Sequence, residues 1–216
     1  MSSPGRFITF EGPEGSGKTT QLKRLVGRLR ERSVVVLICR EPGGTPTGEA
    51  IRDILQHDAT GEEIVPEAEA LLFAASRAQL VHARILPALR EGQWVLCDRF
   101  ADSTTAYQGY GRAFGAARMQ PLNEFAADGT VPDRTFLIDI EPMQARTRLA
   151  ERSRSTGNGP DRIERENEAF HARVREGYLA MAKEEPGRFV VIDGTGLPGE
   201  IEEQIWRSVE RDFINR

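Results

Sequence analysis

The chain has 216 residues, with 29 Lys and Arg against 33 Asp and Glu, which gives a formal net charge of −4 at pH 7. This length is typical of one domain, and the acidic total argues against a bulk nucleic-acid binder or a membrane-surface protein. No apolar run approaches the roughly 18 residues that span a bilayer. Because 39% of the residues are hydrophobic, we expect a single globular domain over residues 1–216.

The two cysteines, Cys39 and Cys97, each lie in an apolar stretch that is typical of a strand. A disulfide framework is not expected from this placement, and a reducing compartment fits it better. Residues 1–5 contain no apolar signal-peptide segment. The sequence therefore predicts a cytoplasmic protein.

Near the amino terminus, a predicted strand, a glycine-rich turn and a predicted helix follow one another. Residues 6–10 are apolar, β-branched and aromatic, and apolar residues recur at helical spacing over 22–29. The turn between them fits the G-x-x-x-x-G-K-[ST] pattern of a phosphate-binding loop: Gly12, Pro13, Glu14, Gly15, Ser16, Gly17, Lys18, Thr19 and Thr20. In such a loop the backbone N–H groups point at phosphate oxygens, Lys18 reaches the β- and γ-phosphates, and the Thr19 hydroxyl ligates Mg²⁺.

Four further apolar stretches are predicted strands, at 34–39, 94–97, 135–140 and 188–193. The first is a continuous apolar run, as in a parallel strand that is buried on both faces. The spacing of apolar residues predicts helices at about 48–56, at 66–89 with an interruption near Pro87, from 142, from 161 and over 201–213. Strands that alternate with helices predict an α/β fold with a parallel sheet, whose ligands bind at the carboxyl ends of the strands.

Charged residues follow two of the predicted strands, Arg40 and Glu41 after the second and Asp98 and Arg99 after the third. In a P-loop protein, an acid at the end of a neighbouring strand is where a ligand of Mg²⁺ or its water belongs, which favours that role for Asp98. Arg99 then offers a planar, permanently charged group that suits a phosphate.

Two other features are ambiguous when spacing alone is considered. Phe73 and Arg77 lie four residues apart and share one helix face, an arrangement more typical of a core residue beside a solvated one. The arginines of 146–165 could form a solvated helix face. The loop at 157–160, rich in Gly, Asn and Pro, instead favours a mobile lid over 149–165.

Six segments, which follow one another in order over most of the chain, resemble the bacterial thymidylate kinases: 12–21, 40–45, 73–79, 98–100, 103–109 and 161–164. The segments at 40–45 and 106–109 are far more specific than the P-loop. The resemblance implies the reaction ATP + dTMP → ADP + dTDP, a step of dTTP biosynthesis, with Mg²⁺. It also implies a three-layer P-loop sandwich with five parallel strands in the order 2-3-1-4-5, and usually a homodimer.

The resemblance further implies roles for single residues of the dTMP site. Phe73 would stack on thymine, Tyr107 would pack near the 2′ edge of the sugar, and Glu14 would lie near the 3′-hydroxyl. Hydrogen bonds to the base edge would come from Arg77, Thr104 and Gln108, and contacts to the acceptor phosphate from Arg52 and Arg99, with Glu41 in the same site.

On the donor side, the resemblance places the ATP phosphates on the P-loop and Mg²⁺ at Thr19 and Asp98, directly or through water. Family members without a basic residue inside the P-loop carry catalytic arginines in the lid. Because Gly15 occupies that P-loop position, the lid arginines Arg152 and Arg154 are expected to join the other catalytic residues, Lys18, Asp98 and Arg99. The insertion at 157–159 leaves open which lid arginine reaches the phosphates.

Two alternatives remain open from the residues. Another P-loop nucleoside monophosphate or small-molecule kinase would differ only on the acceptor side. A GTPase-like switch would carry N-K-x-D for guanine, which the sequence lacks. Residues 193–196 do fit D-x-x-G, but they follow the fifth strand rather than the strand beside the P-loop.

Overall fold

The protein is described by a computed structural model that covers residues 5–57, 61–156 and 159–215. Its strands are β1 (Phe7–Glu11), β2 (Val36–Arg40), β3 (Trp94–Asp98), β4 (Arg134–Asp139) and β5 (Phe189–Asp193). All pair in parallel, in the order β2-β3-β1-β4-β5. The α/β fold and the strand order 2-3-1-4-5 are confirmed.

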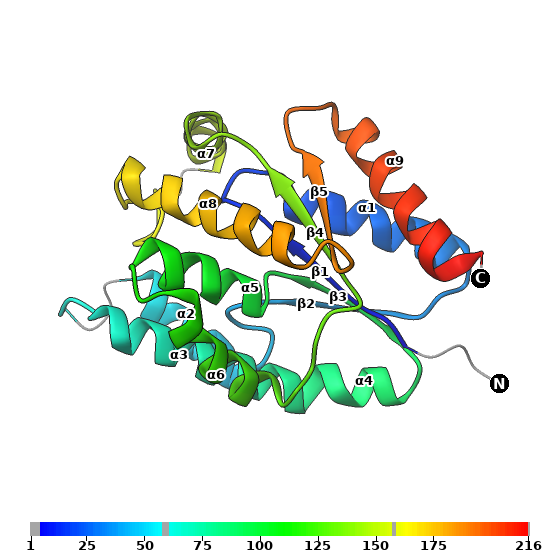
Figure 1. Ribbon diagram of the computed structural model, residues 1–216, viewed down its shortest axis with the longest axis horizontal. Coiled ribbons are helices and arrows are strands. Elements are labelled where there is room, and N and C mark those ends of the chain that lie inside the picture. The colour runs from blue at the N-terminus through cyan, green and yellow to red at the C-terminus, as the bar shows by residue number, and fades with distance from the viewer. Residues whose placement is uncertain (1–4, 58–60, 157–158, 216) are drawn as a thin grey trace.

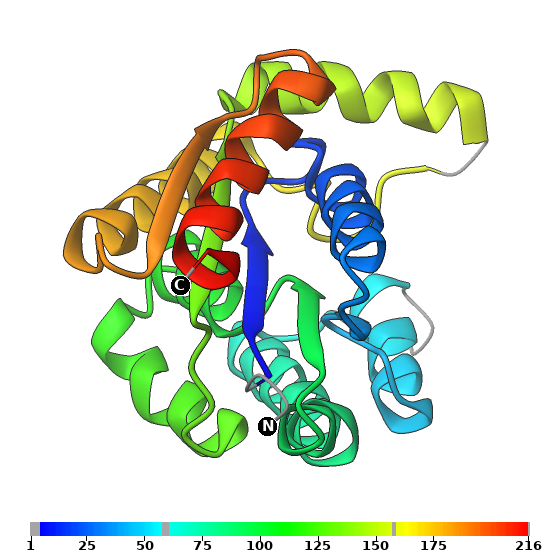
Figure 2. The ribbon, with the colours of Figure 1, turned by 90° about the vertical axis from the view of Figure 1, so that its right-hand side faces the viewer.

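Helices cover both faces of the sheet and give three layers (Figures 1 and 2). They are α1 (Lys18–Glu31), α2 (Pro46–Gln56), α3 (Pro66–Leu80), α4 (Leu86–Arg90), α5 (Ala101–Thr104), α6 (Ala116–Ala127), α7 (Pro142–Thr156), α8 (Glu168–Glu184) and α9 (Pro198–Val209). On one face, α1 and α9 pack on the sheet over a core that includes Phe10, Leu25, Phe136 and Ile205. On the other face, α3, α4, α5 and α8 pack on a second and a third apolar cluster.

Strand β2 is less buried than its sequence predicts. Of its residues only Cys39 is buried, Val36 and Leu37 are half-buried, and Ile38 is 46% exposed. The prediction of a strand buried on both faces was wrong because β2 forms an edge of the sheet and, among the described strands, pairs with β3 alone. Strand order, which is not a local property of the sequence, decides this exposure.

The predicted long helix at 66–89 is interrupted near Pro87, as expected. A π-helical stretch, η1 (Val81–Ile85), joins α3 to α4, and Pro87 lies in the first turn of α4. Proline lacks an N–H and clashes with the carbonyl four residues earlier, so the preceding turn widens and the chain continues as helix. Similar widened stretches occur at η2 (Thr105–Gly111) and η3 (Glu210–Ile214).

Two features of the helices differ from the sequence prediction. Helix α6 was not predicted, because its apolar residues show little helical periodicity and Pro121 lies inside it. The helix predicted from Asp161 begins instead at Glu168. The Asp161 carboxylate accepts the backbone N–H groups of Ile163 (2.9 Å) and Glu164 (2.8 Å), which holds this stretch as a turn.

Among the residues that the structure covers, no helix combines the length and the hydropathy of a membrane-crossing segment. The two cysteines are buried and free. They lie side by side in register on β2 and β3.

Asn167 caps helix α8 by accepting the N–H of Phe170 at 2.9 Å. We expect Asn167→Ala to lower the free energy of unfolding by about 1 kcal/mol, because one N-terminal donor of the helix loses its partner. For a chain of this size the melting temperature falls by roughly 2–4 °C, measured by circular dichroism. Asn167→Asp keeps the cap and serves as the control. A melting temperature of Asn167→Ala equal to that of the parent would contradict this assignment.

Candidate active site

The P-loop connects β1 to α1 at the carboxyl edge of the sheet. Gly12 has a φ of +132°, and a Cβ at this position would lie 2.3 Å from the Ile138 carbonyl oxygen on β4. Gly17, with φ +98°, precedes the first residue of α1 in a left-handed conformation. Only glycine fits both positions, which explains the spacing of glycines in the motif.

Lys18, the first residue of α1, is buried, and its side chain reaches back to the backbone of the P-loop. Its Nζ donates to the carbonyl oxygens of Pro13 (2.8 Å) and Gly12 (3.1 Å). Burial, together with the neighbouring positive charge of Arg99, lowers the pKa of Lys18 to about 8, although Glu14 and Asp98 act in the opposite direction. A phosphate in the loop would provide the negative charge that this buried ammonium lacks.

Thr19 and Asp98 form a pair of hard oxygen donors beside the P-loop. The Thr19 hydroxyl donates to the Asp98 carboxylate at the end of β3. Within the described part of the chain, no cluster of three or more His, Cys, Asp or Glu side chains could hold a metal ion. One hydroxyl and one carboxylate fit Mg²⁺, which takes few protein ligands and completes its shell with substrate phosphates and water.

Arg99 has a left-handed backbone, with φ +72°. Its guanidinium donates to the Glu14 carboxylate (2.6 Å), to the Gly12 carbonyl oxygen (3.0 Å) and to three hydroxyls, those of Ser103, Tyr107 and Tyr178, each at 3.1 Å. These contacts hold a strained residue in place. They also fix a buried positive charge directly under the P-loop.

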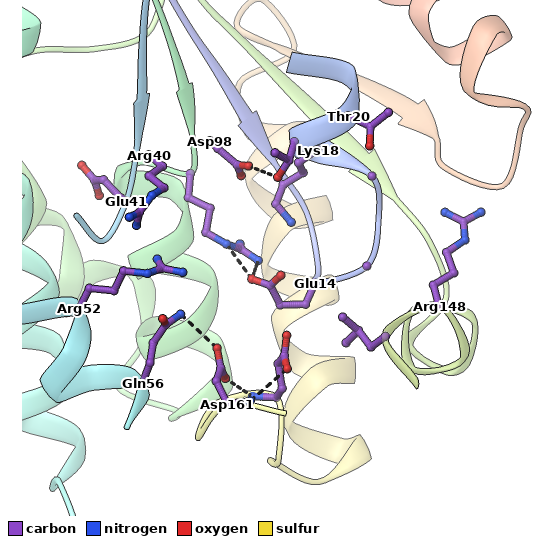
Figure 3. Close-up of a pocket in the computed structure, with 16 residues that line it drawn as sticks. Glu14, Lys18, Thr20, Arg40, Glu41, Arg52, Gln56, Asp98, Arg148 and Asp161 are labelled. Carbon is purple, nitrogen blue, oxygen red and sulfur yellow. Dashed lines mark hydrogen bonds and ion pairs between the residues drawn. The ribbon is translucent and has the colours of Figure 1, made fainter. Parts of the chain in front are cut away.

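Two adjoining cavities open at this edge of the sheet. The larger, of about 540 Å³, runs along the P-loop, and Figure 3 shows Arg52 of α2 extending into it from the side opposite Lys18. The smaller is lined by apolar and polar side chains: Pro42, Leu55, Phe73, Ser103, Thr104, Tyr107, Gln108 and Ile163. Residues common to both cavities are Glu14, Glu41, Arg52, Gln56, Arg99 and Asp161. Arg52 and Arg99 therefore lie at the junction between the cavities.

The predicted acceptor residues divide into cavity-lining and supporting positions. Phe73, Thr104, Tyr107 and Gln108 line the smaller cavity. Arg77 is 1% exposed and does not line it. Its guanidinium donates to Glu41 (2.9 Å), Asn123 (2.8 Å), Thr104 (2.8 Å) and the carbonyl oxygen of Phe100 (3.2 Å).

Glu41 lies behind the junction of the cavities. One of its carboxylate oxygens binds Arg77, while the other is buried with no hydrogen-bond partner among the described residues. Burial raises the pKa of Glu41 against the opposing charge of Arg77. An unpartnered buried oxygen beside a cavity is a site where a ligand or water can donate a hydrogen bond.

Of the described residues of the predicted lid, 149–165, only some line the larger cavity. Helix α7 contributes Arg148 and Leu149 to the lining. Arg154 is exposed near the end of α7, and the side chain of Arg152 lies outside the described residues. Beyond the loop, Asp161 and Glu164 line the larger cavity, and the Asp161 carboxylate accepts the Gln56 amide at 3.3 Å.

Sequence reasoning did not assign several residues of this cavity, namely Arg40, Gln56, Arg148, Asp161 and Glu164. Arg40 and Asp161 lie in recognised motifs, so their motif positions were an available signal. Arg148 gives no such signal. It reaches the site because α7 starts at the carboxyl end of β4, and its guanidinium donates to the Gly194 carbonyl oxygen at 2.9 Å.

A family model described as thymidylate kinase matches residues 10–205. The chain belongs to the thymidylate kinase family. It is 46% identical to the thymidylate kinase of Deinococcus radiodurans over 96% of this chain and 97% of that one. It is 52% identical to the enzyme of Pelotomaculum thermopropionicum over 88% of this chain and 86% of the other.

The fold leads to the same family. The crystal structure of thymidylate kinase from Ehrlichia chaffeensis superposes with a TM-score of 0.76 at 33% identity, over 96% of this chain and 100% of that one. The chain is therefore a P-loop kinase by fold. Enzymes of this family use ATP as the phosphate donor, in general with magnesium.

The lowered pKa of Lys18 gives a test of the P-loop. Because ATP phosphates raise the pKa of a neighbouring ammonium, we expect the protein to take up about half a proton at pH 8 when MgATP binds without dTMP. Calorimetry in buffers of different ionisation enthalpy measures this uptake. Lys18→Met, the control, lacks the titrating group. Equal proton uptake by the parent and by Lys18→Met would contradict the assignment.

Proposed function

We propose that this chain catalyses the reaction of its family, transfer of the γ-phosphoryl group of ATP to dTMP to give dTDP, a step of dTTP biosynthesis, in the two cavities described above. The observation that carries the proposal is their junction, where Arg52 and Arg99 face both spaces. The donor phosphates occupy the P-loop side, over residues 12–20. The thymidine moiety occupies the smaller cavity, and the reacting phosphates meet between them.

The smaller cavity suits a pyrimidine deoxynucleotide. Phe73 offers an aromatic face for stacking on the base, and Tyr107 closes the cavity near the sugar. The Thr104 hydroxyl accepts a hydrogen bond from Arg77, so its own proton is available for a carbonyl oxygen of the base. Arg77 acts here through Thr104, and its direct contact with the base stays a prediction.

Arg52 and Arg99 hold the acceptor phosphate. Arg99 now pairs with Glu14 at 2.6 Å. An incoming phosphate replaces that carboxylate on the guanidinium, and the Glu14 carboxylate accepts the 3′-hydroxyl of the sugar. Glu41 lines the same junction and is paired with Arg77 at 2.8 Å. Paired guanidinium groups suit a phosphate because each presents a planar set of donors.

Positioning and charge carry the chemistry. The acceptor phosphate has a second pKa of about 6, so at neutral pH it is already nucleophilic and needs no general base. Thr19 and Asp98 hold Mg²⁺, which supplies positive charge to the β- and γ-phosphates when it is bound. The Lys18 ammonium contacts the same β- and γ-phosphates. These groups stabilise the charge that spreads over the transferring phosphoryl oxygens.

The lid supplies further positive charge. We assign this role to residues 149–165 of the single domain, with Arg152 and Arg154 as the arginines that serve the transition state. Gly15 leaves the P-loop without a basic side chain at this position. An arginine carried by a closing segment can then stabilise the transferring group.

The buried, reduced cysteines support a cytoplasmic location.

A coupled assay of ADP release against dTMP, dCMP, CMP and AMP tests the proposed function. We expect kcat/KM for dTMP to exceed the other values by at least roughly 100-fold, because the polar groups of the smaller cavity stay unpaired with the wrong base. Lys18→Ala provides the background rate. Comparable kcat/KM values for dTMP and for CMP or AMP would favour a broader nucleoside monophosphate kinase.

The active form is a homodimer in this proposal. Phe125 on α6 is 85% exposed and Leu71 on α3 is 60% exposed, on two helices that pack against each other. Large exposed apolar side chains on neighbouring helices are typical of a subunit interface.

Light scattering after size exclusion tests the homodimer. We expect the parent to have twice the mass of one chain and Phe125→Glu to be monomeric, because the buried charge would be unpaired. Leu197→Glu, at an exposed apolar residue where α9 begins, is the control and stays dimeric. A monomeric parent would refute the dimer, and a dimeric Phe125→Glu would refute this interface.

A further inference from the structure

Glu69 is a fully buried carboxylate on α3 that binds three residues of two other segments, η2 with its C-terminal cap and the turn at 161–164. It accepts the Gln108 amide nitrogen at 2.8 Å. It also binds Arg112, whose Nε and Nη2 lie 3.2 and 2.9 Å from its oxygens, and Arg162, whose Nη2 lies at 2.6 Å. Glu69 does not line either cavity of the active site. Removing a carboxylate from water is costly, and the hydrogen bonds and ion pairs with these three residues offset that cost.

The two arginines keep Glu69 ionised. Burial alone would raise the pKa of this carboxyl, but the hydrogen bonds from Arg112 and Gln108 and the charges of Arg112 and Arg162 outweigh it and leave the pKa below its ordinary value. An ionised carboxylate can only accept hydrogen bonds. Gln108 must therefore turn its NH₂ group toward Glu69, which directs its carbonyl oxygen away from Glu69.

That carbonyl oxygen has no hydrogen-bond partner among the residues that the structure describes, and Gln108 lines the smaller cavity. Thr104, one turn earlier, has a hydroxyl proton available because its oxygen already accepts from Arg77. The cavity thus presents one donor and one acceptor. Thymine carries the complementary pair, a carbonyl oxygen at C4 next to an N3–H. Cytosine carries the reverse, an amino group next to an unprotonated N3.

We propose that Glu69 is a positioning residue for base selection, which fixes the Gln108 amide so that its oxygen accepts the N3–H of thymine. This inference rests on the proposed function and deepens it, because it assigns the choice between thymine and cytosine to a residue that touches neither base. Without the carboxylate the amide is free to rotate. A rotated Gln108 presents NH₂ to the cavity and suits the bare N3 of cytosine.

The test compares kcat/KM for dTMP and for dCMP in Glu69→Gln. We expect the ratio of the two values to fall at least tenfold, with the KM for ATP changed less than twofold. Glu166→Gln is the matched control, since it removes the other carboxylate on Arg112, at 2.5 Å, and leaves Gln108 in place. In Glu166→Gln we expect the ratio of kcat/KM for dTMP to kcat/KM for dCMP to stay within twofold of the parent value. If Glu69→Gln does not fold, Glu69→Asp keeps the charge and withdraws it from Gln108 by one methylene, with the same expected result.

A double-mutant cycle separates positioning from general support of the fold. If Glu69 acts through Gln108, then Glu69→Gln changes the dTMP/dCMP ratio less than twofold in a Gln108→Ala background. An equal loss of ratio in both backgrounds, or an unchanged ratio in folded Glu69→Gln, overturns the inference. A parent enzyme without preference for dTMP instead overturns the proposed function, so the two failures are distinguishable.

Discussion

The carboxyl edge of the sheet is organised around the contact between Glu11 and the residues that follow β3. Glu11 is buried at the end of β1 and accepts the N–H of Phe100 (2.7 Å) and the hydroxyls of Ser103 (2.6 Å) and Tyr178 (2.9 Å). Burial, with the nearby charge of Asp102, raises its pKa to about 7. Because these partners come from the turn after β3, from α5 and from α8, one carboxylate fixes the turn in which Arg99 adopts its left-handed conformation.

In the proposed phosphate site of this acidic chain, the arginines are held in place by partners within the protein. Arg99 binds Glu14, Arg40 binds Glu49 at 2.6 Å, and Arg52 donates to a backbone carbonyl oxygen at 3.1 Å. Each guanidinium keeps a fixed orientation, so little side-chain entropy is lost when phosphate binds. Repulsion between the arginines shows in the pKa of Arg52, which burial and the charge of Arg40 lower. The carboxylates of Glu14 and Glu49 act against this shift.

Local sequence predicted the elements whose determinants are local. The glycines of the P-loop, the apolar strands and the charged residues after β2 and β3 each depend on near neighbours, and their convergence follows from a parallel sheet. The exposure of Ile38 and the burial of Arg77 depend on partners from distant segments. Spacing alone favoured a solvated Arg77, whereas Glu41, Asn123 and Thr104 enclose it. The turn at Asp161 shows the same limit, since helical spacing continues through a segment that side-chain capping holds as a turn.

Helix α3 shows why base recognition could not be predicted from cavity-lining residues alone. It places two buried charges, Glu69 and Arg77, eight residues apart behind the smaller cavity. Arg77 donates to Thr104 and Glu69 accepts from Gln108, so each charge sets the hydrogen-bonding direction of one neutral side chain. A neutral hydroxyl or amide can act as donor or acceptor, and only a charged partner behind it removes that ambiguity. In the proposed mode of base selection, the choice of base edge is therefore set by two charged residues, Glu69 and Arg77, that do not contact the base.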